Sequence, residues 1–63
     1  MNAIKVTMFN GNVVEADVFD YVAQIYEDCK WQTVAVSSDY NEAEKKRKEY
    51  AIKYCYTRIE QLY

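Results

Sequence analysis

The sequence predicts a small α+β domain, in which an antiparallel sheet of four to five strands carries one helix on one face. The N-terminal half holds runs rich in β-branched and aromatic residues, separated by turn residues, which is typical of hairpins. The segment after Asp39 has the cap and charge spacing of an amphipathic helix. With 63 residues the chain has the length of one small domain, and we expect that domain to span residues 1–63.

The first hairpin is indicated by Asn10-Gly11, a dipeptide typical of tight turns, between two runs of alternating apolar residues. Its register follows from the apolar pattern, because a slip of one residue would move every side chain to the other face. We expect a three-residue loop, Asn10 to Asn12. This loop pairs Met8 with Val14, Val6 with Ala16, Ile4 with Val18 and Lys5 with Asp17.

Residues 20–37 allow two interpretations. Read as a helix, they place Val22, Ile25, Tyr26 and Cys29 on one face. Read as a hairpin that turns at Asp28-Cys29, they pair Glu27 with Lys30, Tyr26 with Trp31, Ala23 with Val34 and Tyr21 with Val36. The pattern favours the hairpin, since one register explains an ion pair, an aromatic pair and two apolar pairs. Its weak point is Cys29, because a tight turn favours Gly there, and a longer turn from Glu27 to Lys30 would relieve the strain.

The one clear helix is expected to begin after Asp39, whose spacing from Glu42 fits a capping box. Three Glu–Lys pairs four residues apart support it, namely Glu42–Lys46, Glu44–Lys48 and Glu49–Lys53. The stripe that faces the core contains Ala43, Arg47, Tyr50, Ala51 and Tyr54.

The end of this helix is the second ambiguity. A helix that continued to Tyr63 would be about 36 Å long, whereas a domain of this size has a radius of gyration of about 11 Å. We expect the helix to stop near Tyr54 and a last strand to run from about Tyr56 to Leu62. The apolar stripe also continues through Ile59 without a Gly or Pro, so the longer helix stays open as a dimer seam.

Composition excludes several function classes. The chain has no His and two Cys, which excludes the usual zinc sites and His-based triads, and we expect no metal, no cofactor and no enzymatic activity. Its apolar runs are shorter than the roughly 18–20 residues that cross a bilayer, and its first residues do not resemble a signal peptide. We therefore expect no membrane association and a cytoplasmic location. Cys29 and Cys55 are expected to be free thiols, with Cys29 the exposed one.

Charged and aromatic residues supply the candidate contact surface. Residues 1–42 hold seven acidic and two basic residues, whereas residues 43–63 hold three acidic and six basic ones. We expect acids on adjoining hairpins to form a negative strip next to exposed aromatic rings. The candidate partner-binding residues are Glu15, Asp17, Asp20, Glu27, Asp28, Tyr26 and Trp31. The run Lys45–Lys48 is interpreted as a solvated helix face that nearby glutamates neutralise.

Aromatic residues are numerous for so small a chain, with seven Tyr, two Phe and one Trp. Tyr and Trp suit surfaces that are half apolar and half wet, and a small domain gains stability from a partner subunit. We therefore expect self-association as a homodimer. Four of these rings could also stack nucleic-acid bases, namely Tyr26, Trp31, Tyr54 and Tyr56, although core packing and protein contacts are favoured.

The stretch Val34–Glu44, which runs from a strand into the helix, and the later segment Thr57–Glu60 form a strand–helix–strand module. This module resembles that of small bacteriophage host-takeover and anti-defence proteins, such as anti-CRISPR proteins and inhibitors of host RNA polymerase. The resemblance implies a stoichiometric binder made in a bacterial cytoplasm, and it transfers no functional residue.

We therefore predict a non-enzymatic protein-binding module, namely a phage-encoded inhibitor that occludes a basic or nucleic-acid-binding surface of a bacterial protein or nucleoprotein. We expect no direct nucleic-acid binding, because the acids near the aromatic rings repel phosphate. Two alternatives stay open: a small nucleic-acid-binding regulator that uses the Lys45–Lys48 helix face, and a structural homo-oligomer.

Overall fold

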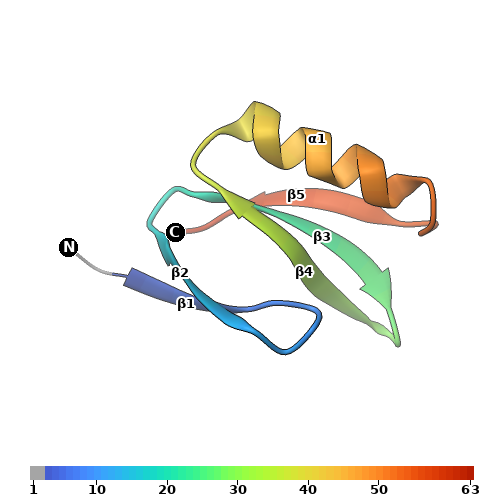
Figure 1. Ribbon diagram of the computed structural model, residues 1–63, viewed down its shortest axis with the longest axis horizontal. Coiled ribbons are helices and arrows are strands. Elements are labelled where there is room, and N and C mark those ends of the chain that lie inside the picture. The colour runs from blue at the N-terminus through green and yellow to red at the C-terminus, as the bar shows by residue number, and fades with distance from the viewer. Residues whose placement is uncertain (1–2) are drawn as a thin grey trace.

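The computed structural model describes residues 3–63, and the first two residues of the expected 1–63 domain lie outside the described residues. The described elements are β1 (Ala3–Thr7), β2 (Val13–Asp17), β3 (Tyr21–Glu27), β4 (Lys30–Ser37), α1 (Tyr40–Ala51) and β5 (Thr57–Gln61) (Figure 1). Strands β1 and β2 form an antiparallel hairpin, and the other three form an antiparallel sheet in the order β4-β3-β5. This confirms the predicted α+β class.

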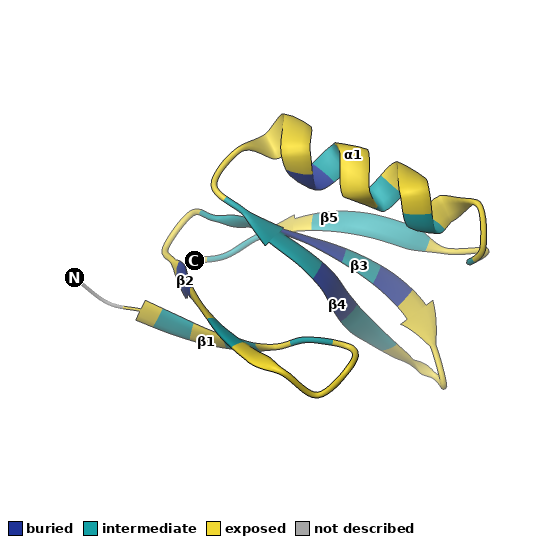
Figure 2. Ribbon diagram, viewed as in Figure 1, coloured by how far each residue is buried: buried dark blue, intermediate teal, exposed yellow. Residues whose placement is uncertain are grey.

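The helix lies on one side of the three-stranded sheet, and the β1–β2 hairpin lies on the other (Figure 1). The main core is under the helix, where Ala23, Ile25 and Val34 are buried and Tyr50 and Tyr54 pack against them. Figure 2 shows buried segments on the inner side of α1 and in the middle of β3 and β4. Because side chains alternate along a strand, β3 turns Ala23 and Ile25 to the helix and its even-numbered residues to the opposite face.

The first hairpin has the predicted apolar face but not the predicted register. Val6 pairs with Val14 and Ile4 with Ala16, so the pairing is offset by two residues and Lys5 lies opposite Glu15 instead of Asp17. The three-residue loop is therefore wrong.

The offset arises because Met8 belongs to the turn. Its N–H donates to the Asn12 carbonyl and its carbonyl accepts from Gly11, whose φ is +92°. Met8 also bridges to Thr33 at the edge of β4, and the ring of Phe9 lies 6.0 Å from that of Tyr50. The turn residues thus attach the hairpin to the rest of the fold.

The second hairpin is confirmed, with Glu27 paired to Lys30 and Tyr26 to Trp31. Its turn is the tight one, since Asp28 and Cys29 have φ values of 56° and 62°, and the longer turn from Glu27 to Lys30 does not form.

The two inner pairs predicted for this hairpin are wrong. Ala23 pairs with Ala35 instead of Val34, and Tyr21 pairs with Ser37 instead of Val36. A β-bulge makes Val34 the extra residue, and Val34 is 7% exposed. The bulge lets Val34 and its neighbour Ala35 both contact the core beneath the helix.

The helix is capped by Asp39 but is shorter than predicted. The Asp39 carboxylate accepts from the Asn41 N–H at 2.9 Å. The Asp39 N–H donates to the Ser37 hydroxyl, so Ser37 and not Glu42 accepts the hydrogen bond that closes the predicted capping box. The helix ends at Ala51, which is exposed, instead of near Tyr54. Residues Thr57–Gln61 form the predicted last strand, so the long-helix alternative is wrong.

The ion pairs on the helix span three residues instead of the predicted four. Arg47 pairs with Glu44, and Lys46 lies 3.9 Å from Glu49.

Candidate functional site

A row of three aromatic rings crosses the sheet on the face away from the helix. Trp31 of β4 lies 5.2 Å from Tyr26 of β3, and Tyr26 lies 6.5 Å from Tyr56, which directly precedes β5, between ring centroids. The Tyr26 N–H donates to the Tyr56 carbonyl at 3.0 Å, which fixes the third ring beside the second. We call Trp31, Tyr26 and Tyr56 the aromatic row.

A second row, made of polar side chains, runs beside the first across the same three strands. The Gln24 side-chain amide donates to the Thr33 hydroxyl at 3.1 Å and accepts from Nε of Arg58 at 2.8 Å. The Arg58 guanidinium carbon lies 4.1 Å from the centre of a Trp31 ring, which is a cation–π contact. The polar row, Thr33, Gln24 and Arg58, therefore holds the aromatic row in place from one side.

The aromatic row is open to solvent on its outer side. Tyr26 is 40% exposed and Tyr56 is 67% exposed. A shallow hollow of about 370 Å³ separates Trp31 from the turn of the first hairpin. Exposed Tyr beside Trp and Arg is the composition found at the energetic centres of protein interfaces, so this surface is suited to contact another macromolecule.

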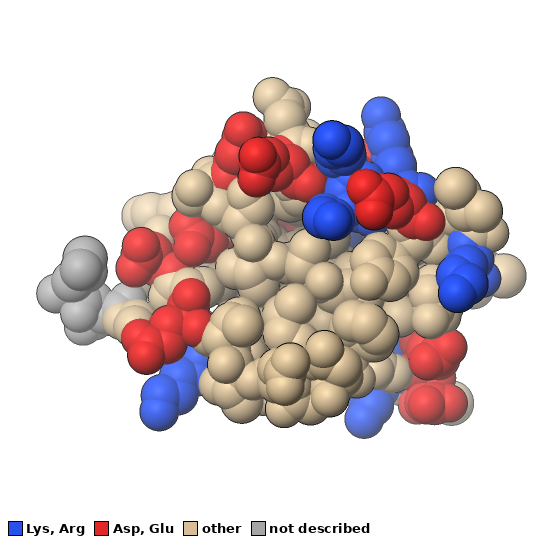
Figure 3. Space-filling model, viewed as in Figure 1, with Lys and Arg blue, Asp and Glu red and all other residues tan. Residues whose placement is uncertain are grey.

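The structure does not bring the five candidate acids into one strip. Glu27 and Asp28 lie at the β3–β4 turn, beside the aromatic row, whereas Glu15, Asp17 and Asp20 line a hollow near the β2–β3 turn. These two turns lie at opposite ends of the longest axis, which measures 36 Å (Figure 1). Figure 3 shows acidic side chains at both ends with a largely uncharged area between them. The expected continuous strip is therefore wrong, because one group of acids lies near the start of β3 and the other at its end.

The basic run on the helix is divided between two surroundings. Arg47 turns toward the sheet, where it donates to the Glu44 carboxylate and, through Nη1, to the Thr57 hydroxyl at 2.9 Å. The hydrogen bond from Arg47 holds the pKa of Glu44 below its usual value, and the same bond raises the pKa of Arg47.

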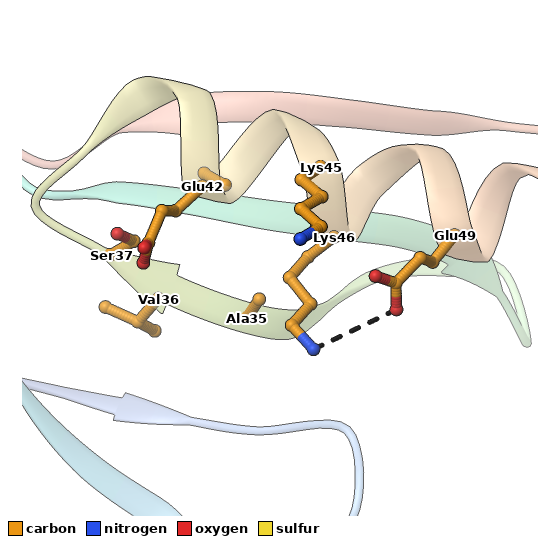
Figure 4. Close-up of a pocket in the computed structure, with 8 residues that line it drawn as sticks. Ala35, Val36, Ser37, Glu42, Lys45, Lys46 and Glu49 are labelled. Atoms are coloured by element: carbon orange, nitrogen blue, oxygen red, sulfur yellow. Dashed lines mark ion pairs between the residues drawn. The ribbon is translucent and has the colours of Figure 1, made fainter.

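Lys45 and Lys46 border a hollow of about 360 Å³ between the helix and β4, together with two carboxylates (Figure 4). Lys46 lies 3.9 Å from one of these, Glu49. Since glutamates alternate with the lysines here, the run presents no uniform cationic face.

Other functional chemistry would come from residues that could bind a metal, react as thiols or cross a membrane. Within residues 3–63 no three His, Cys, Asp or Glu side chains are arranged to hold a metal ion. Cys29 and Cys55 are both free and both exposed, so the prediction that only Cys29 is exposed was wrong. In the same part of the chain, no helix is long and apolar enough to cross a membrane.

Sequence reasoning found two of the three members of the aromatic row, Tyr26 and Trp31, because a single hairpin register placed them opposite each other. It assigned no site role to Gln24 or Arg58. The signal for Arg58 was weak, since its position depends on where β5 begins, which was the least certain boundary in the chain. Tyr54, grouped with these aromatic residues, instead packs on the core beneath the helix.

Comparison with known proteins does not assign this chain to a family. No protein-family model, no curated protein sequence and no solved structure gives a significant match to this chain.

Proposed function

We propose that this protein is a non-enzymatic protein-binding module that contacts its partner through the aromatic row. The observation that carries the proposal is the exposure of Tyr26 and Tyr56 beside Trp31, on the sheet face opposite the helix. Burial of such rings supplies most of the free energy in many interfaces. A standard interface covers about 800 Å² on each partner, which is roughly a sixth of the 4588 Å² that this protein exposes.

The partner we propose is a basic or nucleic-acid-binding surface of a bacterial protein or nucleoprotein. Glu27 and Asp28 lie beside the aromatic row at the β3–β4 turn, and the exposed Glu15 and Asp17 belong to the hairpin on the same side of the sheet. Carboxylates at both ends of an uncharged area would steer a positively charged groove onto the rings. The protein would then act as a phage-encoded inhibitor in the host cytoplasm, where it excludes nucleic acid from that groove.

A nucleic-acid-binding regulator is the second candidate. Arg58 beside three aromatic rings favours it, because single-stranded nucleic acids bind to stacking platforms with nearby cations. Arg58 is already engaged by Trp31 and Gln24, however, and Glu27 and Asp28 beside the row repel phosphate. The structure offers no better support to the Lys45–Lys48 face, since Arg47 binds Glu44.

The test compares two tyrosine variants as bait in a bacterial lysate. Tyr56→Ala removes an exposed ring of the aromatic row, and Tyr63→Ala removes an even more exposed ring that contacts Phe19 instead. We expect a basic protein to be retained by the wild type and by Tyr63→Ala, and lost with Tyr56→Ala. The purified partner should lose its own nucleic-acid binding when the wild type is added.

Two further measurements separate the candidates. Adding Glu15→Lys and Asp17→Lys together should slow association with the purified partner at low salt and have little effect at high salt, because exposed charges are screened. A single-stranded oligonucleotide titrated into the protein should give no binding at low salt. Tight, salt-sensitive binding of that oligonucleotide, or a partner retained equally by both tyrosine variants, would contradict the proposal.

A further inference from the structure

Strand β5 is the outer strand of the three-stranded sheet, and within residues 3–63 no other strand pairs with its free edge. The opposite edge of the sheet is different. There Met8 forms a bridge to Thr33, and the Phe9 N–H donates to the Thr33 carbonyl at 2.8 Å. An unpaired edge is a template for another strand, and proteins usually blunt such edges with charge, proline or covering segments.

The hydrogen bonds to β3 determine which backbone groups of β5 point outward. Tyr26 donates to Tyr56 at one end of the pairing, and Leu62 donates to Asp20 at the other. In an antiparallel pair the bonded residues alternate, so the even-numbered residues of β5 bond to β3. The N–H and C=O groups of Thr57, Ile59 and Gln61 therefore face away from the sheet, toward the free edge.

The sequence of β5 is complementary to itself in the register that these outward groups allow. If two copies pair antiparallel about Ile59, the outward residues meet one another, with Ile59 opposite Ile59 and Thr57 opposite Gln61 of the second copy. The same register sets Arg58 opposite Glu60 of the second copy, twice across the two-fold axis. Non-bonded pairs have the closest side chains, which is where opposite charges interact best.

The two charged residues, Arg58 and Glu60, form no ion pair within the described part of one copy. The partners of Arg58 there are the neutral Gln24 and Trp31. The edge of β2 offers the contrasting case, because pairing two copies about its central residue would place Glu15 opposite Glu15. Charge thus disfavours pairing about the central residue of β2 and favours it about the central residue of β5.

We propose that the protein forms a symmetric dimer by antiparallel pairing of β5 with β5 of a second copy. The dimer has one continuous six-stranded sheet with the order β4-β3-β5-β5-β3-β4. Both helices lie on one face of this sheet, and both aromatic rows lie on the other, one on each side of the two-fold axis. This dimer is independent of the partner proposed above and leaves Tyr26 and Trp31 free.

Hydrogen exchange of individual amides tests the pairing directly. The amides of Arg58 and Glu60 bond within one copy, so they should be protected at every protein concentration. Those of Thr57, Ile59 and Gln61 should be protected at millimolar protein and exchange freely at low micromolar protein. Free exchange of these three amides at both concentrations would overturn the proposal.

Variants at the edge give a second test by analytical ultracentrifugation. Glu60→Arg makes the facing charges alike. Gln61→Pro removes an outward N–H without removing a backbone bond to β3, and it also removes the hydrogen bond from the Gln61 side chain to the Phe19 carbonyl. Each should weaken dimerisation at least tenfold, while Glu49→Arg, the same charge change on the helix, should not. The double variant Arg58→Glu with Glu60→Arg restores opposite charges and should dimerise more tightly than Glu60→Arg. A monomer at millimolar wild-type protein, or a dimer that neither edge variant weakens, would refute this interface.

Discussion

From the geometry of the turn between β3 and β4 we predict that a single substitution, Cys29→Gly, increases the stability of the protein. Cys29 has a φ of 62°, and its side chain is exposed and unbonded. Holding a residue with a Cβ in the left-handed region costs about 1–2 kcal/mol. Glycine removes that cost but gives the unfolded chain more freedom, which offsets about 0.5–1 kcal/mol of the gain. The substitution should therefore raise the free energy of unfolding by about 0.5–1 kcal/mol.

Thermal unfolding followed by circular dichroism measures this effect. For a domain of this size 1 kcal/mol shifts Tm by about 4–8 °C, so we expect Cys29→Gly to raise Tm by about 2–8 °C. Cys29→Ala is the matched control, since it removes the thiol but keeps the Cβ, and it should leave Tm nearly unchanged.

The sign of the difference between Gly and Ala distinguishes the two interpretations of residues 20–37. In a helix, Gly is less stable than Ala by about 1 kcal/mol, whereas at a positive φ it is more stable. A Tm for Cys29→Gly below that of Cys29→Ala would therefore refute the tight turn at Asp28-Cys29, and with it the register that places Tyr26 beside Trp31.

Three further predictions concern the helix and the core. Asp39→Ala should cost about 0.5–2 kcal/mol in urea unfolding, because the N–H of Asn41 loses its acceptor, and Asp39→Asn should retain most of the stability. Ile25→Val should cost about 0.5–1.5 kcal/mol, because Ile25 is 1% exposed in the main core; the same change at Ile52, which is 88% exposed, should have almost no effect. The pKa of Glu44 is lowered from 4.5 by the hydrogen bond from Arg47, so its contribution to stability is complete above that value and is lost as the pH falls through the folded-state pKa. Urea unfolding in acid should show a smaller loss of stability for Glu44→Gln than for the wild type, and equal losses would contradict the pair.

Local signals in the sequence were enough to predict the type and order of the strands and the helix, and to predict which side chains share a face. Alternation placed Val6 and Val14 on the same face of the first hairpin, although not opposite each other, and the Asp39 cap placed the helix start. Contacts between distant elements decided the rest. The bulge at Val34 exists because two successive residues of β4 meet the helix-side core, and the offset of the first hairpin exists because Met8 and Phe9 bind β4 and Tyr50. No local pattern reports such contacts.

The candidate site divides in the same way. Tyr26 and Trp31 are neighbours in a hairpin with a two-residue turn, so their pairing was predictable from residues a few positions apart. Arg58 reaches them from a strand 34 residues away from Gln24 in the chain, and its role follows only from the order β4-β3-β5. The separation of the acids into two groups follows from the extended β3 strand, which has one group near its start and the other at its end.

The central claim is that the aromatic row is the surface that meets the partner, and Trp31 allows a direct measurement because it is the one Trp in the sequence. Protein labelled with fluorotryptophan gives a single fluorine resonance, from the β4 end of the aromatic row. Titration of the purified partner should shift or broaden this resonance in proportion to the bound fraction, and Tyr56→Ala should abolish the change. A resonance that stays unchanged while the partner is fully bound would show that binding occurs elsewhere on the molecule.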